Sequence, residues 1–154
     1  MNRTEAYLRC VVNKAWMIGL VALFALAGCT GAKTLPAEEA TAFANQVDAM
    51  TENLLVSLSN HKYATYTQDM DATMKAASGE AQFEQAYAMV IGKIGKYVSR
   101  QMTKVIEQKS FRTVMYDAQF EQEQHVTVRV VYSITGDQPL ASGLWFDSPK
   151  LRQK

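Results

Sequence analysis

Cysteine and histidine side chains in this chain are examined first, because both types bind metals and act as nucleophiles or bases. The chain of 154 residues contains two of each, which are Cys10, Cys29, His61 and His125. Both cysteines lie in the N-terminal segment, and neither histidine has a second histidine or a glutamate at the spacing that metal sites use. We therefore expect no metal site, no disulfide framework and no cofactor.

Aspartate and tyrosine side chains could instead carry acid–base chemistry together with His125. The possible parts are Tyr63, Tyr66, Asp69 and Asp71. Asp69 and Asp71 are two residues apart on a stretch with helical spacing, so their carboxylates do not point together. His125 follows a Gln-Glu-Gln run, which is typical of a solvated turn. A general base needs a neighbour that shifts its pKa and a site that excludes water, so we expect no catalytic residue here.

Cys29 offers a different chemistry through its sequence context. It ends the motif Leu26–Cys29 (Leu-Ala-Gly-Cys), at the end of an apolar run over Ala15–Ala27. The basic residues Arg3, Arg9 and Lys14 come before that run. The run is shorter than the about 20 residues that a membrane-spanning helix needs. A basic start, a short apolar core and small residues at its end are typical of a secretory signal peptide.

The motif at Cys29 resembles the lipobox of bacterial lipoproteins. The resemblance implies a signal peptide at 1–28, cleavage before Cys29, and a diacylglycerol on its thiol that binds the membrane. Residues 29–35 would then form a lipidated tether, and two acyl chains make such anchoring durable. Thr30 is not the aspartate that resembles an inner-membrane retention signal. We expect a lipid anchor in the cell membrane or outer membrane, facing the periplasm or the cell exterior. The alternative is an uncleaved apolar helix.

The rest of the chain begins with helical periodicity. Pro36 and the carboxylates after it predict the start of a helix that runs to about Ser59. The apolar residues on one face of that helix are Phe43, Val47, Met50, Leu54 and Leu58. The spacing predicts a second, irregular helical stretch over Tyr63–Ala77 and a third helix that begins near Glu80. Gly95 ends this third helix.

After Gly95 the apolar pattern changes from helical spacing to strict alternation, which indicates strands. The predicted strands are Tyr97–Gln108, which suits a sheet edge, Val114–Phe120, Val126–Ile134 and Leu140–Asp147. Helices followed by a meander of about four strands predict an α+β fold, with the N-terminal helices packed on a curved antiparallel sheet. We place a single domain at 36–149 and a C-terminal tail at 150–154.

Two segments resemble a known family, GKIGKYVSR at Gly92–Arg100 and ASGLWFDSP at Ala141–Pro149. Over roughly Phe43–Pro149 the chain resembles the uncharacterised prokaryotic family called domain of unknown function 3887. Its order of elements is similar to the cystatin-like or nuclear transport factor 2-like fold. The resemblance implies that fold and, in many relatives, a secreted or lipid-anchored setting. It implies no reaction, because this fold hosts enzymes, binders and dimerisation modules alike.

The inner face of such a sheet curls around its helices and can leave a cone-shaped pocket. We expect this face and the helix opposite to be rich in aromatic side chains. The residues concerned are Phe83, Tyr87, Tyr116, Phe120, Tyr132, Leu144 and Phe146. They would line a site for a small molecule, or they would simply fill the core. The sequence leaves both interpretations open.

The outer face of the sheet is a second candidate site. Alternation places Met115, Val131 and Trp145 on it, with Gly143 beside Trp145. Large apolar side chains on the outside are unusual for a monomer, and Trp and Met are favoured at interface centres. We expect a second copy of the chain or an envelope protein to dock here. The alternative is a register slip of one residue, which would turn Trp145 inward.

Composition and charge narrow the class of function. The chain is 48% hydrophobic and 20% charged, with a net charge of +1 and interspersed signs. A polyanion binder gathers a basic excess on one face, so we expect no nucleic-acid partner. The sequence predicts a lipid-anchored cell-envelope protein that acts as a non-catalytic binding or assembly module. The alternative is a small-molecule binder or isomerase-like enzyme that uses the cone-shaped pocket.

Overall fold

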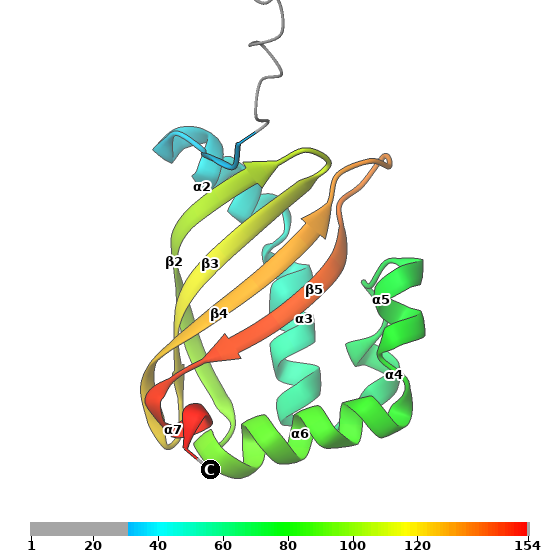
Figure 1. Ribbon diagram of the computed structural model, residues 1–154, viewed down its shortest axis with the longest axis vertical. Coiled ribbons are helices and arrows are strands. Elements are labelled where there is room, and N and C mark those ends of the chain that lie inside the picture. Colours follow the sequence, from blue (N-terminus) through cyan, green and yellow to red (C-terminus); the bar gives the residue numbers. More distant parts are fainter. Residues whose placement is uncertain (1–30, 154) are drawn as a thin grey trace, which may run out of the picture. The chain divides into compact units, whose positions relative to one another are not determined.

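A curved antiparallel sheet is the central element of the computed structural model, which describes residues 31–153 (Figure 1). Its strands are neighbours in chain order. They are β1 (Lys33–Thr34), β2 (Tyr97–Gln108), β3 (Phe111–Phe120), β4 (Glu123–Ser133) and β5 (Leu140–Asp147). Antiparallel neighbours need only short connections, which fits the close spacing of the four long strands along the chain. The predicted α+β fold is confirmed, with β1 as an additional strand.

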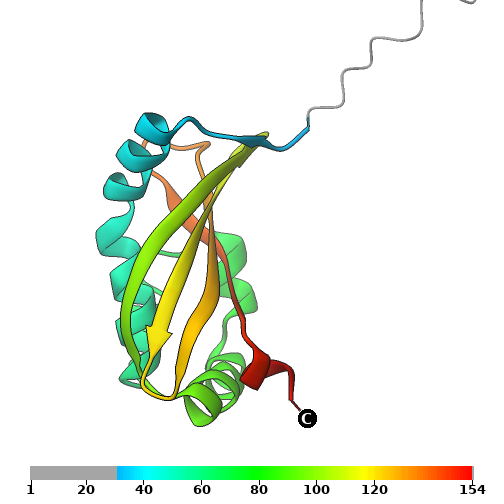
Figure 2. The same cartoon turned by 90° about the vertical axis from the view of Figure 1, so that its left-hand side faces the viewer.

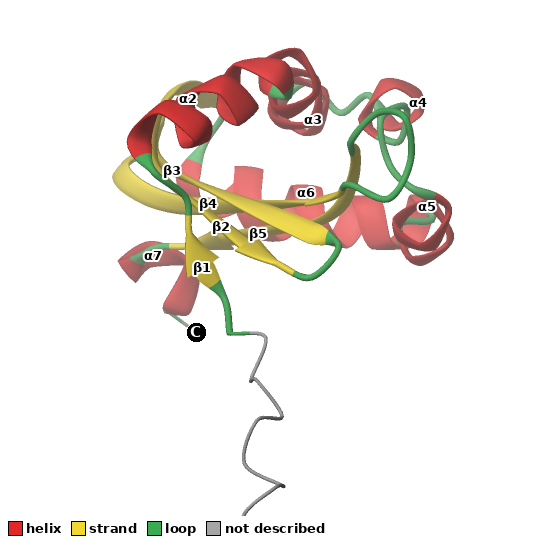
Figure 3. Cartoon of the chain, turned by 90° about the horizontal axis from the view of Figure 1, so that it is seen from above, coloured by secondary structure: helices red, strands yellow, loops and turns green. Residues whose placement is uncertain are grey.

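The four long strands are preceded by α2 (Ala37–Gln46), α3 (Asp48–Ser59), α4 (Tyr63–Tyr66), α5 (Ala72–Ala77) and α6 (Glu80–Ile94), and α7 (Pro149–Arg152) follows the sheet. Helices α2 and α3 pack on one face of the sheet (Figure 2), whereas α6 crosses one end of it (Figure 1). Figure 3 looks down on this arrangement and shows α2, α3 and α4 on the same side of the strands. Within residues 31–153, the helices therefore leave much of the opposite, outer face of the sheet uncovered.

The predicted helix from Pro36 to about Ser59 is in fact two helices that meet at Val47. Val47 has φ −101° and ψ 6°, outside the helical region. The ladder of backbone hydrogen bonds nevertheless continues, from Val47 to Phe43 and from Thr51 to Val47. The Thr51 hydroxyl also donates to the Val47 carbonyl at 3.0 Å, and such bonds often bend helices. The bend lets one apolar stripe follow a curved sheet.

The predicted irregular stretch Tyr63–Ala77 consists of the short helices α4 and α5 with a turn between them. In that turn Met70 forms a bridge with Ala141 of β5. The Asp71 backbone N–H donates to the Ala141 carbonyl at 2.8 Å. An uncovered strand edge exposes unpaired backbone donors and acceptors, so this contact protects part of β5. Helical periodicity could not predict it, because the partner lies far away in the sequence.

The N-terminal boundary of the folded domain lies earlier than predicted. In the predicted tether 29–35, β1 instead pairs with Glu107 and Ile106 of β2. Leu35 follows β1, is buried, and donates its backbone N–H to the Val105 carbonyl at 2.9 Å. A strand of two residues is too short to show an alternating sequence pattern. The burial of Leu35 supplies the apolar contact that holds this segment on the sheet.

The C-terminal boundary also differs from the prediction, because the predicted tail at 150–154 contributes to a helix. Ser148 is buried, and its hydroxyl accepts a hydrogen bond from the Leu151 backbone N–H at 3.3 Å, which caps α7. Pro149 occupies the first turn. Ser followed by Pro is a strong helix-start signal, so this helix could have been predicted from sequence.

The core lies between the helices and the concave face of the sheet. The predicted alternation is confirmed in β3 and β4, whose buried residues are Val114, Tyr116, Ala118, Phe120, Val126, Val128, Val130 and Tyr132. The predicted third helix is also confirmed as α6. Gly95 ends α6 with a φ of 78°, and a Cβ there would come within 2.8 Å of the Glu121 side chain. A residue with a side chain would be strained in this position.

Candidate functional site

The side chains predicted to line a cone-shaped pocket pack together between the helices and the sheet. Phe83, Tyr116, Phe120 and Tyr132 are buried, and Tyr87, Leu144 and Phe146 are half-buried against them. Tyr132 meets Phe43 edge-on, with ring centroids 6.0 Å apart, and Phe120 meets Phe146 in the same way at 6.1 Å. Edge-to-face contacts of this kind are typical of a packed core.

The hydroxyl groups of two of these tyrosines meet at Thr51 of α3. The Thr51 oxygen lies 2.6 Å from the Tyr132 hydroxyl and 3.1 Å from the Tyr116 hydroxyl. Thr51 donates its single proton to the Val47 carbonyl, so both tyrosines donate to the two lone pairs of Thr51. Burial raises the pKa of both tyrosines. These hydroxyls stay protonated and donate their hydrogen bonds within the core.

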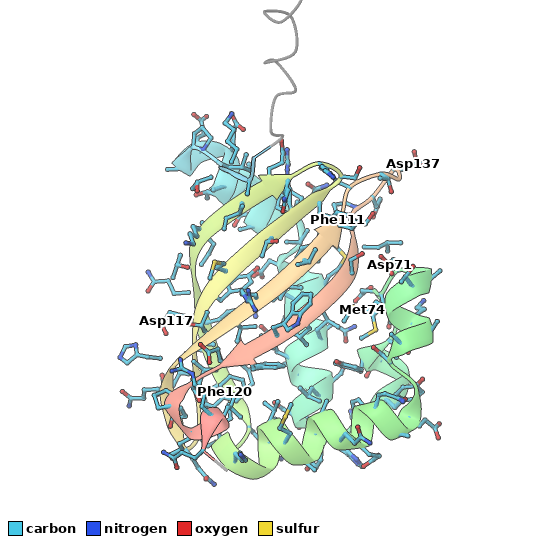
Figure 4. All side chains as sticks on the ribbon, viewed as in Figure 1. Asp71, Met74, Phe111, Asp117, Phe120 and Asp137 are labelled. Carbon is cyan, nitrogen blue, oxygen red and sulfur yellow. The ribbon has the colours of Figure 1, made fainter. Side chains whose placement is uncertain are left out.

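The residues considered for acid–base chemistry do not converge. Asp71 accepts hydrogen bonds from the Met74 backbone N–H at 2.7 Å and from the Ser142 hydroxyl. Asp69 accepts one from the Asn53 amide at 2.8 Å. The exposed His125 contacts Asp117 at 2.9 Å. Figure 4 shows Asp71 and Asp117 near opposite lateral edges of the sheet.

The two tyrosines considered with them lie beside an aromatic residue of α6. Tyr63 and Tyr66 contact the Phe83 ring, with centroids 5.6 Å and 5.0 Å from it. Burial raises the pKa of Tyr66, which favours its neutral form. Both rings thus help to join α4 to α6.

We expect Asp71→Ala to lower the free energy of unfolding by about 1 kcal/mol at pH 7, because the carboxylate caps α5. The Met74 N–H and then the Ser142 hydroxyl hold the pKa of Asp71 below its usual range. A lowered pKa in the folded state adds stability above the unfolded pKa of about 4, and this stability is lost as the pH falls through the folded value. Urea unfolding at pH 7 and pH 2 measures the difference.

Asp137→Ala is the matched control, since Asp137 is an exposed carboxylate in the β4–β5 loop. It should change the free energy of unfolding by less than about 0.5 kcal/mol. An Asp71→Ala effect of equal size at pH 7 and pH 2 would show that the carboxylate charge is not its source.

Trp145 is the most prominent residue of the outer sheet face. Its side chain is 48% exposed. The indole lies across Gly143, because a Cβ on Gly143 would approach the ring to 2.2 Å. The Arg129 guanidinium lies 5.7 Å from the ring centroid, within cation–π range. The structure therefore places Trp145 outward and holds its ring against the sheet.

Met115 and Val131 lie on the same outer face and are half-buried. Met115 pairs with Arg129, and Val131 pairs with Gly143. The register-slip alternative is not observed, because the neighbours of Val131 in β4 are buried. The three predicted interface residues, with Arg129 among them, form one continuous surface, which we call the Trp145 surface (Met115, Arg129, Val131 and Trp145).

Phe111 and Leu140 are two exposed apolar residues of the same face that the sequence analysis missed. Phe111 pairs with Ser133, which in turn pairs with Leu140. Continuing the alternation from Met115 toward the start of β3 would have found Phe111. Leu140 was hidden by a β-bulge, since the register between β4 and β5 shifts between Val131 and Tyr132. A bulge changes which side chains face outward.

A groove of about 530 Å³ lies between the start of β2 and helices α2 and α3. The Arg100 side chain on its wall is only 7% exposed. Its Nη2 donates to the Asp48 carboxylate at 2.6 Å and to the Asp48 carbonyl at 3.0 Å. Its Nη1 donates to Glu52 and to the Tyr97 hydroxyl. All four Nη protons are thus used within the chain, so Arg100 fixes α3 on the sheet.

Among residues 31–153, no three His, Cys, Asp or Glu side chains are grouped so that they could hold a metal ion. Over the same range no helix is long and apolar enough to cross a membrane. The predicted lipidation site at Cys29 lies outside the described residues.

Comparison with known proteins adds one finding. A family model described as "Protein of unknown function (DUF3887)" matches residues 51–140. No curated protein and no solved structure matches the chain. The matched range begins at Thr51 and ends at Leu140, so it includes the buried hydroxyl contacts and leaves out Trp145.

Proposed function

The chain belongs to the DUF3887 family of proteins of unknown function, and we propose that this member is a lipid-anchored cell-envelope protein that acts as a non-catalytic binding or assembly module. The observation that carries this proposal is the Trp145 surface. Its central side chain is exposed yet held in place by Gly143 and Arg129. Interfaces gain affinity when such aromatic anchors are ordered before binding.

The second part of the proposal concerns the anchor. The lipobox-like motif ends at Cys29, and β1 begins at Lys33. An extended chain reaches about 3.5 Å per residue, so the four steps between these residues span at most about 14 Å. This is shorter than the tether expected from the sequence. A diacylglycerol on Cys29 would hold the domain against the membrane surface.

The third part concerns the partner, which we propose is a second copy of the chain. On the Trp145 surface, Met115 and Trp145 lie on either side of Arg129, and the charged residues Asp117 and Asp147 lie in the next row of the same face. Aromatic residues, Met and Arg are enriched at protein interfaces. Two such sheets can pack face to face about 10 Å apart, and a two-fold axis would place the same surface on both sides.

Mass spectrometry of the protein extracted from membranes tests the anchor. We expect an N-terminus at Cys29 and the added mass of a diacylglycerol. Cys29→Ala should carry no added lipid, whereas Cys10→Ala is the matched control and should be lipidated like the wild type. A wild-type protein that begins at Met1, or that carries an unmodified Cys29, would contradict the anchor.

A further inference from the structure

One end of the sheet carries exposed apolar and basic side chains next to the point where the chain enters the domain. We call it the sheet rim and define it by Lys33, Lys109, Phe111 and Leu140. Phe111 is 43% exposed and Leu140 is 42% exposed. Both pair with Ser133 of β4, which lies between them in the sheet. In Figure 4, Phe111 lies at the end of the sheet near the β4–β5 loop.

Strand pairing brings the start of the described chain to this same end. Lys33 in β1 lies opposite Glu107 of β2, and the next residue, Gln108, lies opposite Phe111 of β3. Lys109 is in the tight turn that joins β2 to β3. The first strand and the β2–β3 hairpin are therefore neighbours in the sheet.

The tether length limits how far the sheet rim can be from a bilayer. If Cys29 carries a diacylglycerol, Lys33 lies within about 14 Å of the lipidated Cys29 backbone, at about 3.5 Å per residue. The headgroup region of one leaflet is about 5 to 8 Å thick. A domain held this closely must turn some surface toward the headgroups, and the sheet rim lies where the described chain enters the domain at Lys33.

We propose that the sheet rim is a membrane-contact site that lies among the lipid headgroups and orients the domain. This inference rests on the lipid anchor of the proposed function. Phe111 and Leu140 would enter the boundary between headgroups and acyl chains, where apolar side chains are buried while nearby lysines stay solvated. Lys33 and Lys109 would meet lipid phosphates.

The charge of this end predicts how the contact depends on lipid composition. Arg112 and Glu107 neutralise each other across a 2.7 Å hydrogen bond. Asp137 adds a carboxylate in the β4–β5 loop, against the two lysines of the sheet rim. The net positive charge of the sheet rim is therefore small, so the apolar side chains contribute most of its affinity for the membrane. We expect the strength of the membrane contact to differ by less than threefold between neutral and anionic vesicles.

The contact leaves Met115 and Trp145 free for a protein partner. Phe111 begins β3, whereas Met115 lies four residues further along the same face. At about 3.4 Å per residue, these positions are separated by about 14 Å. The bilayer and a partner protein would thus use different parts of one sheet.

Fluorescence quenching by spin-labelled lipids tests this orientation in the lipidated full chain. Cys10 leaves with the signal peptide and Cys29 is blocked by lipid, so an introduced cysteine is the only reactive thiol. Ser110→Cys lies in the β2–β3 hairpin and leaves Phe111 intact. Gln119→Cys is the matched control, since it is exposed at the far end of β3. Each is labelled with an environment-sensitive dye and reconstituted in vesicles that contain headgroup-nitroxide lipids.

We expect at least fivefold stronger quenching at position 110 than at position 119. In the Ser110→Cys background, replacing Phe111 and Leu140 with serine should reduce the quenching at least twofold. The protein should still float with the vesicles, and its urea unfolding midpoint checks that it remains folded.

Four outcomes would overturn the proposal in different ways. Weak quenching at both positions in a protein that floats with vesicles overturns the rim contact and leaves the anchor standing. Equally strong quenching at both positions also overturns it, because the sheet would lie flat. A blue-shifted dye at position 110 without quenching points to a protein partner at the rim. A protein that does not float, with a free thiol at Cys29, overturns the anchor itself.

Discussion

Replacing Trp145 with alanine is expected to weaken self-association of the domain by about 30- to 1000-fold, the range for truncation of an interface hot spot. The indole is exposed, but Gly143 beneath it and Arg129 beside it hold it in one place. Little side-chain entropy is then lost when a partner covers it. Sedimentation of the compact unit Gly31–Lys154 over a concentration series measures the change in dissociation constant.

Met89→Ala is the matched control for this prediction. Met89 is also a large exposed apolar residue, but it belongs to α6 and not to the outer sheet face. Its replacement should leave the dissociation constant unchanged within about twofold. A wild-type domain that stays monomeric, or a Trp145→Ala variant that sediments like the wild type, would rule out the Trp145 surface as a self-association site.

The outer sheet face shows what an alternating sequence pattern can predict. Alternation along β3 and β4 places Met115 and Val131 outward, because side chains of a regular strand change sides at every residue. The pattern also places Trp145 outward, and all three positions agree with the structure. It fails at Leu140, since the bulge opposite Val131 shifts the register. A bulge depends on the partner strand and leaves no clear local signal.

Contacts between segments that are distant in sequence account for most of the other differences between the predicted and the observed structure. The turn after α4 bonds to Ala141, and β1 pairs with Glu107 and Ile106. Both contacts place backbone groups on strand edges, where any residue except proline can supply both the donor and the acceptor. The bend at Val47 fits the curvature of the sheet, which the sequence pattern of one helix does not encode. Arg100 was missed for a similar reason, because Asp48 and Glu52 are far from it in sequence.

Replacing Thr51 with valine is expected to lower the free energy of unfolding by about 3 kcal/mol. Valine keeps the shape of threonine but removes the oxygen that accepts hydrogen bonds from Tyr116 and Tyr132. Each buried hydroxyl left without an acceptor costs about 1 to 3 kcal/mol. Urea unfolding at pH 7 measures the loss. Thr41→Val is the matched control, because the Thr41 hydroxyl makes the same bond to the carbonyl four residues earlier but is exposed.

A second substitution separates the hydroxyl contacts from other effects of valine at position 51. Tyr132→Phe in the Thr51→Val background removes one of the two stranded hydroxyls, so it should recover about 1 kcal/mol, whereas the same change in the wild type should destabilise. A core that is filled by these side chains requires this coupling. If Thr51→Val behaved like Thr41→Val, water or a ligand would have to supply the missing acceptor, and the inner face would be an open pocket after all.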